Sequence, residues 1–287
     1  MPAQQIAENL AYINWTVLTG AAVGSFWAAA LGRLATEATK GYLAFVALSA
    51  ALLGALAALS DGALPVSSSN AGSVSGAVPA AGSSLALMRE VALWALVAVA
   101  LVYGVALLRG ARGTWLAVAG SLVGGVVLLG GAISWGGGPD RLLAGAWLLV
   151  QLVTLAAATG GAWAAMILGH WYLVTPKLPE GPLVRFARTL TAVVAVQLVL
   201  FAVWTAAGAG PAGLPGFRAL LGTWALFVWL RLIVGLAMPL VVTWAAIQTA
   251  RSRSMESATG LLYIDVGLIA AGTILAAGLY FGAGLLV

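Results

Sequence analysis

Residues 87–135 run LMREVALWALVAVALVYGVALL-RGARG-TWLAVAGSLVGGVVLLGGAISW, two long apolar stretches on either side of a short basic connection. A helix needs about 20 residues, at 1.5 Å per residue, to cross about 30 Å of hydrocarbon, and each stretch reaches that length. Helix is the expected conformation, because a segment in lipid must satisfy its own backbone hydrogen bonds. The alternation of a β-barrel strand is missing from both stretches. They therefore predict two transmembrane helices.

The composition of the whole chain resembles that of these two stretches. It has 287 residues, 62% hydrophobic and 7% charged, with a mean hydropathy of +1.06. A soluble domain is about 45–50% apolar and about 25% charged. Six further stretches have the same character, so we predict an all-α fold: one transmembrane domain, a bundle of eight helices. The predicted spans are about 9–32, 41–60, 87–108, 114–135, 142–175, 183–208, 217–249 and 258–286.

Lysine and arginine are concentrated in the connections on one side of the predicted membrane. Nine lie there, against three in the other connections, Arg89, Arg141 and Arg218. Because positive charge marks cytoplasmic connections, both chain termini are expected outside. The net charge of +5 then follows from topology, and no nucleic-acid partner is expected. The composition and the short inner connections favour a bacterial plasma membrane. The nine inner residues are Arg33, Lys40, Arg109, Arg112, Lys177, Arg185, Arg188, Arg251 and Arg253.

The one long connection, residues 61–86, is rich in serine, glycine, alanine and proline. Its composition predicts a flexible outer loop, and two interpretations stay open for it: a spacer, or a segment ordered by a partner subunit. Elsewhere, small surfaces for close helix approach are predicted at Gly120, Gly124, Gly125, Gly160 and Gly161. No internal repeat is expected from the sequence.

Several kinds of chemistry are excluded by residues the chain lacks. It has no cysteine, which excludes iron–sulfur ligation and thiol catalysis, and its single histidine excludes a bis-histidine haem or a closed metal site. A Walker glycine loop is also missing. We therefore expect no metal, no covalently bound cofactor and no self-sufficient catalytic centre.

A first group of polar residues is predicted at depth in the outer half of the membrane. An ionisable residue inside a bilayer requires a partner, and Arg231 lies in the outer half of its span. Glu90, Gln197 and Gln151 are expected at a similar depth. The group is either a structural ion pair or a polar pocket for a carbonyl-bearing ligand such as a quinone. Pro239 predicts a kink in the same helix as Arg231.

A second polar group is expected near the cytoplasmic side. His170 lies seven residues before Lys177, and Asp265 and Tyr263 have a comparable depth on the last span. A histidine–aspartate pair at this depth can relay protons, because imidazole titrates near neutral pH. The alternative is a structural role at the interface.

The length, the eight spans and the outside termini resemble the eight-helix membrane-anchor subunits of polysulfide reductase and DMSO reductase type enzymes. The resemblance covers the layout of the whole chain and assigns no residue a role. It implies a respiratory subunit that binds quinone, contacts the lipid bilayer and has partner subunits that carry the redox centres. Two other functions remain open, a structural subunit without its own ligand and a secondary transporter for a small solute.

Overall fold

The computed structural model describes residues 2–64, 66–67, 81–136, 142–175 and 178–287 of the chain. Eight helices in this part are long and apolar enough to cross a membrane, as the sequence predicts. The elements are α1 (Pro2–Glu8), α2 (Leu10–Ala35), α3 (Lys40–Asp61), α4 (Ser83–Leu108), α5 (Thr114–Trp135), α6 (Leu142–Val174), α7 (Gly181–Ala207), the 3-10 turn η2 (Arg218–Leu220), α8 (Ala225–Leu232), the π turn η3 (Ile233–Ala237), α9 (Met238–Arg251) and α10 (Met255–Ala283).

Two predicted boundaries need correction. Residues 83–86 belong to α4 rather than to the long connection, and the seventh span becomes α-helical at Ala225 rather than near residue 217. Between α3 and α4, the two-residue strands β1 (Val66–Ser67) and β2 (Ala81–Gly82) pair in parallel. The prediction of a flexible loop rests on residues 68–80, which lie outside the described residues.

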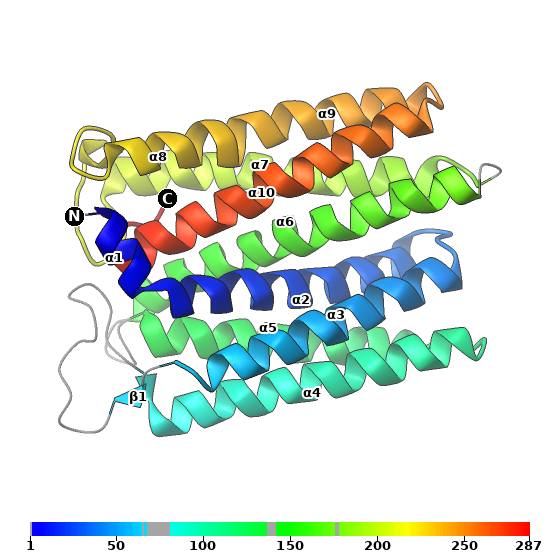
Figure 1. Cartoon of the computed structure of the whole chain (residues 1–287), viewed down its shortest axis with the longest axis horizontal. Coiled ribbons are helices and arrows are strands. Elements are labelled where there is room, and N and C mark those ends of the chain that lie inside the picture. Colours follow the sequence, from blue (N-terminus) through cyan, green and yellow to red (C-terminus); the bar gives the residue numbers. More distant parts are fainter. Residues whose placement is uncertain (1, 65, 68–80, 137–141, 176–177) are drawn as a thin grey trace.

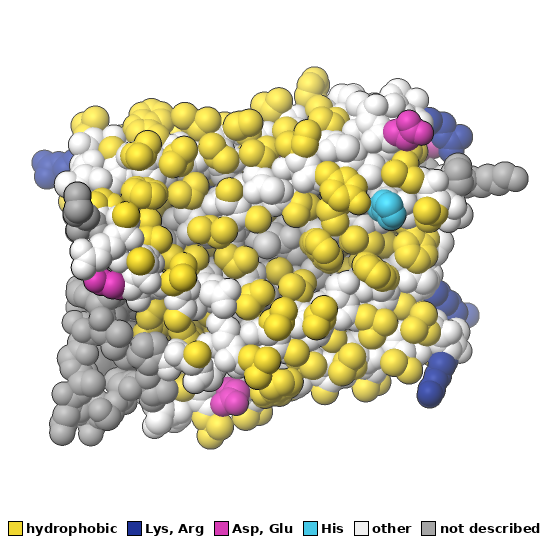
Figure 2. Space-filling view, in the orientation of Figure 1, with side chains coloured by type: hydrophobic (Ala, Val, Ile, Leu, Met, Phe, Trp, Pro, Cys, Tyr) yellow, Lys and Arg dark blue, Asp and Glu magenta, His cyan; other side chains and the backbone are white. Residues whose placement is uncertain are grey.

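The helices run side by side, with both chain termini at one end of the bundle (Figure 1). We call this the predicted outer end, after the charge distribution. Apolar side chains cover the middle of the surface, and most of the lysine and arginine side chains in view lie at the opposite end (Figure 2). This surface suits a multi-pass membrane protein, whose middle contacts lipid and whose ends contact water.

The eight helices form two rings of four with the same connectivity. In the first half, α2, α3, α4 and α5 follow one another and α5 closes the ring against α2; in the second, α6, α7, α8–α9 and α10 do the same. Between the halves, α2 packs on α6, α10 packs on α2, and α5 packs on α6. The two halves are therefore related by a pseudo-two-fold axis along the predicted membrane normal. Helices at equivalent positions in the two halves begin at the same end of the bundle (Figure 1).

A weak sequence repeat accompanies this symmetry and corrects the expectation of none. Residues 17–31 read VLTGAAVGSFWAAAL and residues 153–167 read VTLAAATGGAWAAMI, which aligns Gly24 with Gly160 and Trp27 with Trp163. The α2–α6 contact needs these glycines. A Cβ on Gly24 would lie 1.8 Å from the Ala156 oxygen, and one on Gly160 would lie 2.0 Å from a backbone nitrogen of α2. Small residues thus let the two halves meet backbone to backbone.

The third and seventh spanning helices, α4 and α8–η3–α9, show why the sequence repeat is hard to see. Helix α4 has 26 residues and the α8–η3–α9 helix has 27, and the π turn η3 absorbs the extra residue. Before that turn the two helices align without a gap. Arg89 follows six residues after the start of α4, and Arg231 follows six residues after the start of α8. Each half therefore buries one arginine at the same place.

Candidate functional site

Arg231 is the buried arginine of the second half, and its side chain is 2% exposed. Its Nη2 donates to Oε1 of Gln197 at 3.0 Å, and Gln197 is one of the three residues expected at its depth. Its Nη1 donates to the Gly235 carbonyl at 3.3 Å, while its Nε has no partner within the described part of the chain. Pro239 has no N–H to offer the carbonyl four residues before it, so Gly235 is free to accept from Arg231.

Gln197 connects three helices around this guanidinium. Its Oε1 accepts from Arg231, and its Nε2 donates to the Thr154 carbonyl of α6 at 2.7 Å. Both polar ends of the amide are therefore used, which fixes its orientation. The arrangement holds α6, α7 and α8 together at one polar point in an otherwise apolar region.

Two glycines make room for the arginine. A Cβ on Gly272 of α10 would lie 2.8 Å from Nη1 of Arg231 and 2.6 Å from the Gly235 Cα. Helix α10 and the π turn η3 therefore approach each other closely, and the guanidinium packs beside their contact. The predicted kink at Pro239 takes the form of this π turn, which ends two residues before the proline.

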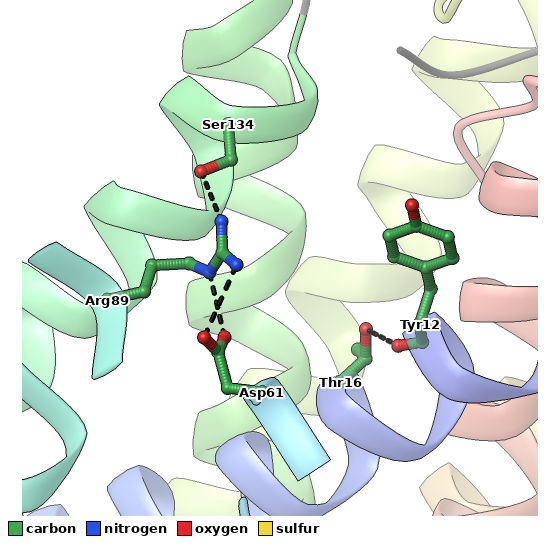
Figure 3. A network of polar contacts seen from close by, with 5 residues as sticks. All are labelled: Tyr12, Thr16, Asp61, Arg89 and Ser134. Atoms are coloured by element: carbon green, nitrogen blue, oxygen red, sulfur yellow. Dashed lines mark hydrogen bonds and ion pairs between the residues drawn. The ribbon is translucent and has the colours of Figure 1, made fainter. Parts of the chain in front are cut away.

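The equivalent arginine of the first half, Arg89, has a complete set of partners (Figure 3). Its Nε donates to Oδ1 of Asp61 at 2.8 Å, and its Nη2 lies 3.4 Å from Oδ2. Its Nη1 donates to Oγ of Ser134 at 2.6 Å, and its guanidinium carbon lies 4.6 Å from the centre of the Trp135 ring. Nearby on α2, Thr16 donates to a carbonyl of its own helix. This site is closed and charge-balanced.

The sequence interpretation assigned Arg89 and Asp61 to the outer surface, and the structure corrects this. They lie on the buried faces of α4 and α3, with side chains 1% and 3% exposed. A usable signal was present, since Asp61 directly follows one predicted span and Arg89 stands at the start of the next. Neighbouring antiparallel helices bring such ends together.

The second half has no acidic residue at the position equivalent to Asp61. Counted from Gly41 and Gly181 near the starts of α3 and α7, the equivalent of Asp61 is Phe201, a buried apolar residue. Arg231 instead contacts Gln197, which precedes Phe201 by one turn on α7. No described carboxylate forms a salt bridge with Arg231. Within the described residues, Arg89 of the first half therefore has a carboxylate partner, and its equivalent Arg231 has none.

Two predicted members of the outer group lie elsewhere. Glu90 is on α4 in the first half, across the molecule from α8 (Figure 1), so its predicted proximity to Arg231 is wrong. One residue earlier on the same helix, Arg89 takes the inward position. Gln151 is buried on α6, and its Nε2 donates to the main-chain oxygen of Val287 at 3.3 Å rather than contacting Arg231.

The inner group is divided between two faces of α10. Tyr263 and His170 are exposed, with 3.5 Å between Oη and Nδ1. Asp265 is fully buried, and neither of its carboxylate oxygens has a partner among the residues described. The histidine–aspartate pair expected from the sequence is therefore not formed, because residues two apart on a helix point in different directions.

Comparison of the chain with protein-family models, curated proteins and solved structures finds no match. The described residues also contain no group of three or more histidine, aspartate or glutamate side chains that could hold a metal ion.

Proposed function

We propose that the chain is a membrane-anchor subunit of an electron-transfer complex and binds a quinone against Arg231. One observation carries this proposal: the buried arginine of the second half has no carboxylate partner among the described residues, while its equivalent in the first half has Asp61. A buried guanidinium favours an oxygen acceptor. A ligand carbonyl would supply one to the unpartnered Nε.

The surroundings of Arg231 suit a lipid-soluble ligand. Trp229 of α8 and Ile233 of η3 are 45% and 49% exposed, so apolar surface adjoins the polar point. Quinone sites combine an apolar surface with a few polar groups that fix the carbonyls. Gln197 orients the guanidinium. The redox centres would lie on partner subunits, in a bacterial plasma membrane, with both termini of this chain outside.

The test measures quinone bound to the protein purified in mild detergent. Arg231→Met should lower the affinity at least about tenfold, because a hydrogen bond to a charged group contributes about 1.5–3 kcal/mol. Gln197→Glu should also weaken binding, since a carboxylate would neutralise Arg231. Arg253→Gln, which alters an exposed ion pair with Glu180, is the matched control. Equal quinone content in all four proteins would overturn the proposal.

A secondary transporter is the second candidate, and the pseudo-two-fold repeat favours it. Transporters are commonly built from such repeats, with interrupted helices at the substrate site, and η3 interrupts the helix that carries Arg231. Uptake of a small anionic solute by proteoliposomes containing this chain alone would support this function. If Arg231→Met lowers only assembly and stability, the chain is instead a structural subunit.

A further inference from the structure

Asp265 is a carboxyl group near the middle of α10 that the proposed quinone site does not use. It is 0% exposed and lies ten residues after the helix begins at Met255, about 15 Å along the axis. Both carboxylate oxygens lack partners among the described residues. An ionised carboxylate is unfavourable in such surroundings, so the side chain holds a proton in this state.

The first half has no carboxyl at the equivalent position. When α5 and α10 are aligned on their buried aromatic residues Trp135 and Tyr280, Asp265 coincides with Gly120. A Cβ on Gly120 would lie 2.3 Å from the ring of Phe26 on α2. The α6 residue equivalent to Phe26 is Ala162. The second half therefore has a smaller residue on one helix and an acidic side chain on the other.

Arg231 of α8 packs against the same face of α10 on which Asp265 lies. Gly272, beside Nη1 of Arg231, follows Asp265 by seven residues, which is two helical turns and about 10 Å. The Arg231 side chain reaches toward Gly235, in the direction of the end of the bundle where α10 begins. Arg231 and Asp265 form no described ion pair, but a positive charge about two helical turns from a carboxyl group acts on it in a medium of low dielectric constant.

Other ionisable groups on α10 and the helices packed against it form no described hydrogen bond or ion pair with Asp265. His170 of α6 is exposed beside Tyr263, and Arg251 is exposed at the end of α9. Arg33 lies in the last turn of α2. The remaining groups are Tyr12 on α2, Tyr172 on α6, Glu8 on α1, and Glu256 and Tyr280 on α10 itself, and no described hydrogen bond or ion pair joins any of them to Asp265.

We propose that Asp265 is a reversible proton-binding site within the membrane, and that the charge of Arg231 sets the pH at which it releases its proton. A proton suits the site better than a metal cation, since the described residues contain no cluster of metal ligands. The inference does not depend on quinone binding. It assigns the second half a proton-linked role and leaves the charge-balanced first half as its scaffold.

Infrared spectroscopy of the whole protein in lipid bilayers, without quinone, tests the inference. The C=O stretch of a protonated carboxyl in apolar surroundings should be present in the wild type and lost in Asp265→Asn. No such band is expected from Asp61, which forms an ion pair with Arg89. Raising the pH should abolish the band reversibly in the wild type.

Two substitutions of Arg231 test whether its charge sets the pH at which Asp265 releases its proton. Without the positive charge the ionised form of Asp265 is less favourable. In Arg231→Gln the C=O band of the protonated carboxyl should therefore persist to higher pH. The pH at which half of the band is lost should rise by about one unit, for unit charges about 10 Å apart at an effective dielectric constant of about 20. Arg231→Lys keeps the charge and should titrate near the wild-type midpoint.

Either of two results would overturn the proposal. A carboxyl band that is absent from the wild type, or unchanged in Asp265→Asn, would remove the proton site. A midpoint that is the same in Arg231→Gln and the wild type would remove the role of Arg231. Because no quinone is present, neither result depends on the proposed quinone function.

Discussion

Replacing Asp61 with asparagine should strongly destabilise the first half. The substitution keeps the shape of the side chain but removes the charge that faces Arg89, whose side chain is 1% exposed. Breaking a buried ion pair from one side typically costs about 3–5 kcal/mol, because the other charge stays buried. Ser134 at 2.6 Å and the Trp135 ring at 4.6 Å remain as partners of the guanidinium. We therefore expect a loss near the lower limit, about 3 kcal/mol.

Unfolding in mixed detergent micelles, followed by tryptophan fluorescence, measures this loss. A cost of about 3 kcal/mol corresponds to a fall of roughly 6–12 °C in Tm for a domain of this size. The double variant Asp61→Leu with Arg89→Met should be more stable than Asp61→Asn, because it buries no unpaired charge. Glu180→Gln removes the exposed partner of Arg253 at 3.0 Å and should cost at most about 1 kcal/mol.

Two results would contradict the reasoning. If Asp61→Asn unfolds within about 1 kcal/mol of the wild type, the guanidinium does not depend on this carboxylate. If the double variant is as unstable as the single one, the loss arises from packing rather than from the unpaired charge.

Three further predictions concern the halves, the π turn and the topology. Gly160→Ala should destabilise the contact between the halves by about 1–3 kcal/mol in the same unfolding assay, whereas Gly125→Ala, with open space at its Cβ, should not. Pro239→Ala restores a backbone N–H that competes with Arg231 for the Gly235 carbonyl, so it should weaken quinone binding while keeping the fold. Unchanged quinone affinity would argue against this competition. The chain is free of cysteine, so a single cysteine at Arg112 should be shielded from an impermeant maleimide in intact cells, while one at either terminus should react; the reverse pattern would invert the topology.

The sequence by itself determined the membrane-spanning character of this protein. Hydropathy depends on local composition and length, so eight stretches were identifiable without knowing how they pack. The pairing of Arg231 with Gln197 was also predictable, because depth along a helix follows from residue counts. The charge asymmetry predicts which end faces the cytoplasm.

Which residues face inward was decided only by the tertiary structure. Glu90 and Arg89 are adjacent in sequence, yet rotation about α4 buries Arg89 against Asp61 and directs Glu90 away from that pair. The repeat was similarly concealed, since the π turn and unequal connections shift the spacing between halves. Helix rotation and partner choice depend on packing between distant segments, which hydropathy does not encode. The same packing leaves Arg231 and Asp265 without counter-charges in the part of the chain that the structure describes.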